Sequence, residues 1–180
     1  MAFVFIDVSL DMENKAAGIR EKRDEQYGNI YEETDTDIRW VGDLGEICFN
    51  TWLKNNNITN FDWHLENTAG KPDFTINGTR IDVKTVKRKV PPRLDYTAQI
   101  TAQHIHSPVD ELFFCSYEYQ IKRMWLLGGI EKSEFIKKAI FYKAGDKVHE
   151  NYTIRKGHEI YNTALSHLIE PNFYVDRFKN

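Results

Sequence analysis

Two aspartates that a tight turn would bring face to face are the best candidates for chemistry in this sequence. They lie in the segment GKPDFTINGTRIDVK, residues 70–84. Its Asn77-Gly78 pair is a strong hairpin signal, because a type I′ turn needs positive φ at both central residues. With that turn, Asp73 lies opposite Asp82, where paired Cβ atoms are about 4.5–5.5 Å apart. Carboxylates at this distance repel each other, so the pair predicts a bound cation.

The alternation of side chains along the two strands separates polar from apolar residues. One face carries Asp73, Thr75, Arg80, Asp82 and Lys84, and the other carries Phe74, Ile76, Ile81 and Val83. A polar strand face can simply be solvated. Opposed like charges are a cost that a solvated face has no reason to keep. We therefore predict a hairpin with an apolar underside that gathers two acids and a lysine on its upper face.

A glutamate upstream stands on the best predicted helix, residues 37–55. Apolar residues recur there at helical spacing and indicate a buried face: Ile38, Val41, Leu44, Cys48, Phe49 and Trp52. Glu46 lies on another face, together with Arg39, Gly42 and Asp43. A lone helical glutamate is typically solvent-exposed, so the alternative to a site residue is an ordinary surface side chain.

The remaining pattern predicts one α/β domain with a mixed central β-sheet flanked by helices. Expected helices cover residues 11–26, 96–106, 133–142 and 159–169, and expected strands cover 58–66, 72–77, 79–86, 112–119 and 124–130; residues 3–6 are a short strand or an apolar plug. We divide the chain into an N-terminal helical arm (1–36), a core (37–130) and a C-terminal helical extension (131–180).

Composition predicts a cytoplasmic protein. The two cysteines, Cys48 and Cys115, lie in apolar stretches and indicate buried thiols in a reducing compartment. The amino-terminal residues do not form a signal peptide, and no apolar run approaches the roughly 20 residues of a membrane span. The net charge of −3 provides no global attraction to nucleic acid, so any such affinity requires a local patch.

The order of these features resembles the PD-(D/E)XK nuclease superfamily, which includes restriction endonucleases, Holliday junction resolvases and repair exonucleases. The resemblance covers residues 37–119 and implies a restriction endonuclease-like core. It rests on a glutamate on a first core helix, a Pro-Asp entering a strand and an Asp-x-Lys on the next strand. Residue by residue, these positions match Glu46, Asp73, Asp82 and Lys84.

The implied chemistry is phosphodiester hydrolysis, for which a hard divalent cation neutralises charge and activates water. We expect Mg²⁺, with Mn²⁺ able to substitute. Asp73 and Asp82 would bind it, with the Val83 carbonyl a further ligand by resemblance, and Glu46 would hold the metal or a water. Lys84 stays charged beside two carboxylates, which favours electrostatic stabilisation over a role as general base.

A basic run follows the hairpin and predicts contacts with phosphates. It comprises Lys87, Arg88, Lys89 and Arg93, for which a solvated strand end is the alternative. Gln99 and Gln103 lie one turn apart on the expected helix 96–106, and by resemblance such residues border the site. The pair His104 and His106 is more typical of a helix end than of a zinc site. His64 is close in sequence to the hairpin but is typical of a satisfied sheet histidine.

The leading hypothesis is a metal-dependent nuclease that acts on nucleic acid, DNA rather than RNA because most of the superfamily does. Two alternatives remain: a catalytically inactive nucleic-acid-binding or assembly subunit on the same fold, and an unrelated protein whose hairpin acids hold a structural cation. Activity on a duplex favours a homodimer, since each site cuts one strand.

Overall fold

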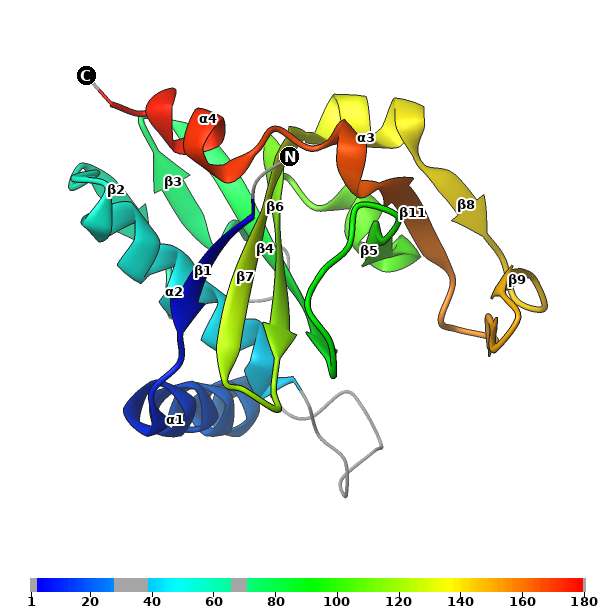
Figure 1. Cartoon of the computed structure of the whole chain (residues 1–180), viewed down its shortest axis with the longest axis horizontal. Helices are drawn as coiled ribbons and strands as arrows, with labels where there is room; N and C mark the ends of the chain where they lie inside the picture. The colour runs from blue at the N-terminus through cyan, green and yellow to red at the C-terminus, as the bar shows by residue number, and fades with distance from the viewer. Residues whose placement is uncertain (1–2, 28–38, 66–70, 180) are drawn as a thin grey trace.

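A six-stranded mixed β-sheet forms the centre of the molecule (Figure 1). The computed structural model describes residues 3–27, 39–65 and 71–179. In spatial order the strands are β1 (Val4–Asp7), β7 (Arg123–Glu131), β6 (Glu111–Glu118), β4 (Thr79–Arg88), β3 (Phe74–Ile76) and β2 (Phe61–Trp63). Only the β4–β6 pair is parallel. The predicted class, a mixed sheet flanked by helices, is confirmed.

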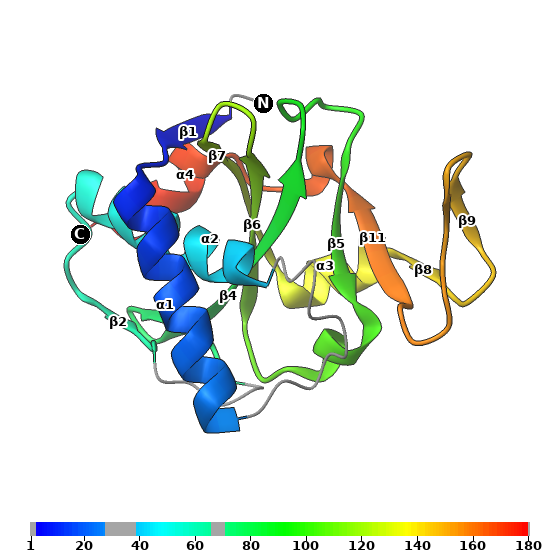
Figure 2. The same cartoon turned by 90° about the horizontal axis from the view of Figure 1, so that it is seen from below.

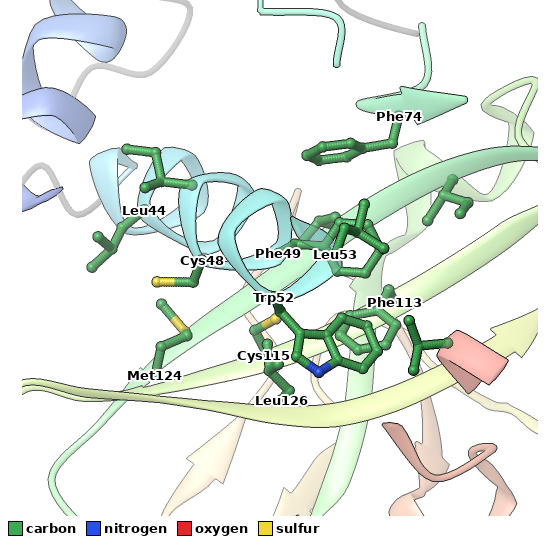
Figure 3. Packing of buried hydrophobic residues seen from close by; sticks show 14 of the residues in the cluster. Leu44, Cys48, Phe49, Trp52, Leu53, Phe74, Phe113, Cys115, Met124 and Leu126 are labelled. Carbon is green, nitrogen blue, oxygen red and sulfur yellow. The ribbon is translucent and has the colours of Figure 1, made fainter. Parts of the chain in front are cut away.

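Two helices, α1 (Leu10–Tyr27) and α2 (Trp40–Asn55), cover one face of this sheet. The predicted apolar stripe of α2 is buried there, and Figure 3 shows Cys48, Phe49 and Trp52 directed at β6. The Phe49 ring lies 4.9 Å from Phe74 of β3 and 4.7 Å from Phe113 of β6. This core fixes α2 across the hairpin and β6.

A smaller sheet and a short helix pack on the opposite face (Figure 2). Its order is β5 (Thr97–Thr101), β11 (Ile160–Ala164) and β8 (Ile140–Tyr142), and α3 (Lys132–Lys138) lies beside it. Ala98 and Ile100 of β5 point into a second core with Leu112 and Phe114 of β6. A two-stranded ribbon of β9 (Lys147–His149) and β10 (Tyr152–Thr153) follows β8.

Two predicted helices are wrong. Residues 96–106 form β5 and a 3-10 turn, η1 (Ala102–His106), and residues 159–169 contain β11 followed by η2 (Leu165–His167). The two strands pair with each other over five residues, so each is stabilised by a partner about sixty positions away. Ala98 and Ile100 alternate inward as a strand requires. Tertiary pairing has overridden local propensity.

Other boundaries moved by smaller amounts. The strand expected over 58–66 is only β2, and α3 stops at Lys138, after which the chain enters β8. Ser133 does not cap α3, whose first residue is Lys132. Pro171 opens the last helix, α4 (Pro171–Asp176), because proline suits the first helical position. Residues 3–6 are a strand, since they fall in β1. The expected helix start at Asp37 lies outside the described residues.

The segments outside residues 37–130 belong to the same packed structure. β1 pairs with β7, and Met12, Ala16 and Ile19 of α1 pack on the main core. Residues 131–180, expected to be helical, contain four short strands as well as α3 and α4. Within the described part of the chain, no helix is long and apolar enough to cross a membrane.

Candidate functional site

The hairpin has the predicted register. Phe74 pairs with Ile81, Thr75 with Arg80 and Ile76 with Thr79. Both turn residues have positive φ, 48° at Asn77 and 83° at Gly78, as a type I′ turn requires. The predicted apolar residues Phe74, Ile76, Ile81 and Val83 are buried in the core beneath α2.

The two aspartates lie side by side at the open end of this hairpin. The Asp73 N–H donates to the Ile81 carbonyl at 3.0 Å, and its Oδ2 accepts the Val83 N–H at 2.7 Å. Asp82 is buried, and its carboxyl acts on that of Asp73. Withdrawal from water raises the pKa of Asp73 well above its usual value, and the charges of Glu46 and Asp82 raise it further.

Lys84 completes the upper face of β4. Its Nζ lies 2.8 Å from Asp82 Oδ2. The backbone N–H of Val83 points toward Asp73. The N–H and C=O of a strand residue point to the same neighbouring strand. The Val83 carbonyl is therefore directed to the Asp73 side of β4, the side on which the resemblance implied a further ligand.

Glu46 is buried rather than solvent-exposed, with 5% of its surface accessible. Its Oε1 accepts a hydrogen bond from Arg23 Nη1 at 2.8 Å, and its Oε2 accepts bonds from Arg23 Nη2 and Trp63 Nε1, each at 3.1 Å. Its charge acts on Asp73, so α2 carries this carboxylate to the hairpin. The reading of Glu46 as an ordinary surface side chain is wrong.

Sequence reasoning missed two arginines of α1 that bind the acids of α2. Arg20 and Arg23 lie one turn apart on α1 and both bind the fully buried Asp43 of α2. Burial raises the pKa of Asp43, whereas the charges of the two guanidinium groups act to lower it. The i, i+3 spacing of the arginines indicated a shared face, but no local rule placed that face over α2.

Two further residues lie near Asp82 on the face of the sheet that is turned away from α1 and α2. His104, half-buried in η1, has a lowered pKa because of burial and then because of the Lys84 charge, while Asp82 acts in the other sense. Lys132, the first residue of α3, donates from its Nζ to the Ser107 carbonyl. Burial lowers the pKa of Lys132, and Asp82 opposes that shift. His64, by contrast, is satisfied by Thr75 Oγ1 at 2.9 Å.

The basic run divides between the two faces of β4. Lys87 lies on the α2 face, 4.8 Å from the Tyr119 ring centre and 5.8 Å from that of Trp40. Arg88 lies on the other face, 4.8 Å from the ring centre of Tyr96.

The remaining predicted contacts are dispersed. Lys89 is exposed beyond the end of β4, and Arg93 pairs with Asp95 at 3.0 Å. The expected helix carrying Gln99 and Gln103 is absent: Gln99 lies in β5, and Gln103 is exposed in η1. Its neighbour His104 is the η1 residue on which the charges of Lys84 and Asp82 act.

The site therefore gathers Asp73, Asp82 and Lys84 tightly, with Glu46 held beside them by Arg23. Among the described residues, no three acid, histidine or cysteine side chains already form a group that could hold a metal. Both oxygens of Glu46 are engaged by other donors, which leaves the aspartate pair as the nearest match to a cation site. In comparisons with known proteins, no family model and no curated protein matches the sequence.

Proposed function

We propose that this protein is a divalent-metal-dependent nuclease that hydrolyses phosphodiester bonds in nucleic acid, DNA rather than RNA. One observation carries the proposal. The carboxyl of Asp82 acts on that of Asp73, and Lys84, two residues along the same strand, contacts Asp82 through its Nζ. Three such groups, converging at the end of a rigid hairpin, are what metal-assisted phosphodiester hydrolysis requires.

The aspartate pair fits a divalent cation. Burial raises the pKa of Asp73, and the charges of Glu46 and Asp82 raise it further; a cation would offset the effect of those charges. Asp73 and Asp82 would hold Mg²⁺, with the Val83 carbonyl directed to the same side; Mg²⁺ needs few protein ligands because it keeps several waters. Bound there, the cation would neutralise charge on the scissile phosphate and activate water.

Besides the bound cation, the protein itself contributes a positive charge to the site through Lys84. Its ammonium group has three N–H donors, and the contact with Asp82 uses one. The others can hold a phosphate oxygen or orient the attacking water. Because the amine is paired with the Asp82 carboxylate, we assign it transition-state stabilisation rather than proton abstraction.

Arg88 extends the same face of β4, four residues beyond Lys84. A nucleic-acid backbone that reaches Asp82 along this face would meet Arg88 and then Arg93, both of which lie near the Tyr96 ring. Such contacts position a substrate without reading its sequence.

The free, buried thiols of Cys48 and Cys115 suit the cytoplasm, and cleavage of both strands of a duplex would use a homodimer.

A second candidate is a nucleic-acid-binding subunit without turnover. It is favoured by one observation, the engagement of Glu46 by Arg23 and Trp63 in place of a free carboxylate. Such a protein would bind nucleic acid through the same basic residues and would not cleave it.

Cleavage of single-stranded and duplex DNA and RNA, measured with Mg²⁺, Mn²⁺ or EDTA, separates the two candidates. We expect metal-dependent cleavage by the wild type, and its loss in Asp82→Asn and in Lys84→Ala while nucleic-acid affinity changes less than about threefold. One surface cation contributes little to a contact spread over many phosphates. Binding without cleavage under every condition would replace the nuclease proposal with the second candidate.

A further inference from the structure

Arg23 uses its whole guanidinium group inside the candidate site. Its Nη1 donates to Asp43 Oδ1 at 2.5 Å and to Glu46 Oε1 at 2.8 Å, and its Nη2 donates to Glu46 Oε2 at 3.1 Å. Nε and Nη2 also donate to the Leu65 carbonyl, each at 3.3 Å. These five bonds account for all five N–H groups of an arginine. Arg23 in this position therefore has no N–H for a phosphate.

The same guanidinium lies within electrostatic reach of the hairpin. Burial works against its charge, but Glu46, Asp43 and Asp73 together raise the pKa of Arg23. Asp73 is one of the two residues that would hold the metal. A permanent positive charge is thus bound to the Glu46 carboxylate and acts on Asp73, and only 15% of the Arg23 side chain is exposed.

We propose that Arg23 is the resident cation of this site: it neutralises Asp43 and Glu46 in the metal-free protein and competes with a divalent cation for the Glu46 carboxylate. This inference rests on the proposed function. A dication at Asp73 and Asp82 is repelled by Arg23, and Glu46 can join it only by giving up the bidentate bond. Metal binding is then weaker than the four acids of the site would allow.

Arg20 provides a matched control. It lies one turn earlier on α1 and donates from Nε to Asp43 Oδ2 at 2.8 Å and from Nη2 to Asp43 Oδ1 at 3.0 Å. Arg20 thus has the same charge on the same helix and binds the same acid, but the structure gives it no bond to Glu46. A role that is only structural, holding α1 on α2, would affect both arginines alike.

The test is Mn²⁺ binding to the full chain without nucleic acid, measured by electron paramagnetic resonance and by calorimetry. Arg23→Met should bind Mn²⁺ about tenfold or more tightly than the wild type, because the Glu46 carboxylate, freed from its bonds to Arg23, can then join the cation. Arg20→Met should change the affinity less than about threefold. The gain should disappear in the double variant Arg23→Met with Glu46→Gln, which removes the freed carboxylate.

Removal of Arg23 leaves buried acids uncompensated, so Arg23→Met could fail to fold. A second variant, Arg23→Met with Asp43→Asn, removes one charge of each sign and should show the same tighter binding. Folded variants that bind Mn²⁺ no more tightly than the wild type would overturn the inference. Asp82-dependent cleavage by the wild type reports on the proposed function separately, so either claim can fail alone.

Discussion

Asp73 carries a charge that its own strand does not balance. The residue is half-buried, and burial together with the charges of Glu46 and Asp82 raises the pKa of its carboxyl. Lys84 offsets part of this charge but is paired directly with Asp82. The arrangement destabilises the ionised metal-free protein, as residues retained for chemistry often do.

Asp73→Asn should therefore stabilise the metal-free protein at pH 7, by roughly 1 kcal/mol. The pKa of Asp73 is higher in the folded than in the unfolded chain, so its favourable contribution exists at low pH and is lost as the pH rises through the folded-state value. The gain from asparagine should accordingly shrink toward pH 4. Urea unfolding at the two pH values measures it.

Asp62→Asn is the control for this measurement, because Asp62 is an exposed aspartate on the neighbouring strand β2. Its stability should differ little from that of the wild type at either pH. A loss of stability in Asp73→Asn at pH 7 would show that the bond from the Val83 N–H requires a full carboxylate, and would contradict the assigned electrostatic cost.

The residues that sequence alone could predict are those tied to one another by a local rule. Asp73, Asp82 and Lys84 lie within one hairpin whose register follows from Asn77-Gly78, so their positions on the strands could be written down from the sequence. Arg23 and His104 come from α1 and η1 through tertiary packing, for which no spacing rule exists.

At the level of elements, one close contact between α2 and β4 sets where Glu46 stands. A Cβ at Gly45 would lie 1.8 Å from Thr85 Oγ1 and 3.0 Å from Thr85 Cβ. Glu46 follows Gly45 directly on the helix. The absence of a side chain at position 45 therefore permits α2 to approach the strand that carries Asp82 and Lys84.

Gly45→Ala should destabilise the protein by about 1–3 kcal/mol, since overpacking forces the helix away from β4. Thr85→Ala should restore part of the loss, because it removes the nearest atom. Gly42→Ala is the matched control on the same helix: nothing lies within 4 Å of its Cβ position, and alanine favours helix. Thermal unfolding compares the variants, and equal effects at positions 42 and 45 would refute the close approach.

The elements that sequence reasoning mistook are those with distant partners. β5 and β11 are short, and each is a strand because of the other. The long elements α2, β6 and β7 were predicted because their apolar patterns are strong enough to fix type without a partner.

Across the whole molecule, the two faces of the main sheet serve different ends. The α1–α2 face is closed by the aromatic core and by the ion pairs of Arg20 and Arg23. The other face carries Asp82, Lys84 and Arg88 toward η1 and the strand β5. The net charge of −3 provides no overall attraction to nucleic acid, so the proposed binding requires a local group of cations.

The proposed path along this second face predicts different effects for adjacent basic residues. Replacing Arg88 and Arg93 by glutamine should weaken binding to all nucleic-acid sequences and lower the slope of log affinity against log salt by about 0.9 per lost duplex phosphate contact. Lys87→Gln should change neither, because that amine lies on the α2 face beside Trp40 and Tyr119. Fluorescence anisotropy at several salt concentrations measures both effects.

The comparison also decides from which side a substrate reaches the aspartate pair. If Lys87→Gln weakened binding and the arginine double variant did not, the nucleic acid would lie against α1 and α2. Phosphates would then approach Glu46 and Arg23 rather than Lys84, and a phosphate would become the competitor for the Arg23 guanidinium. The side of β4 that carries the binding energy therefore determines whether Arg23 opposes only the metal or also receives the substrate.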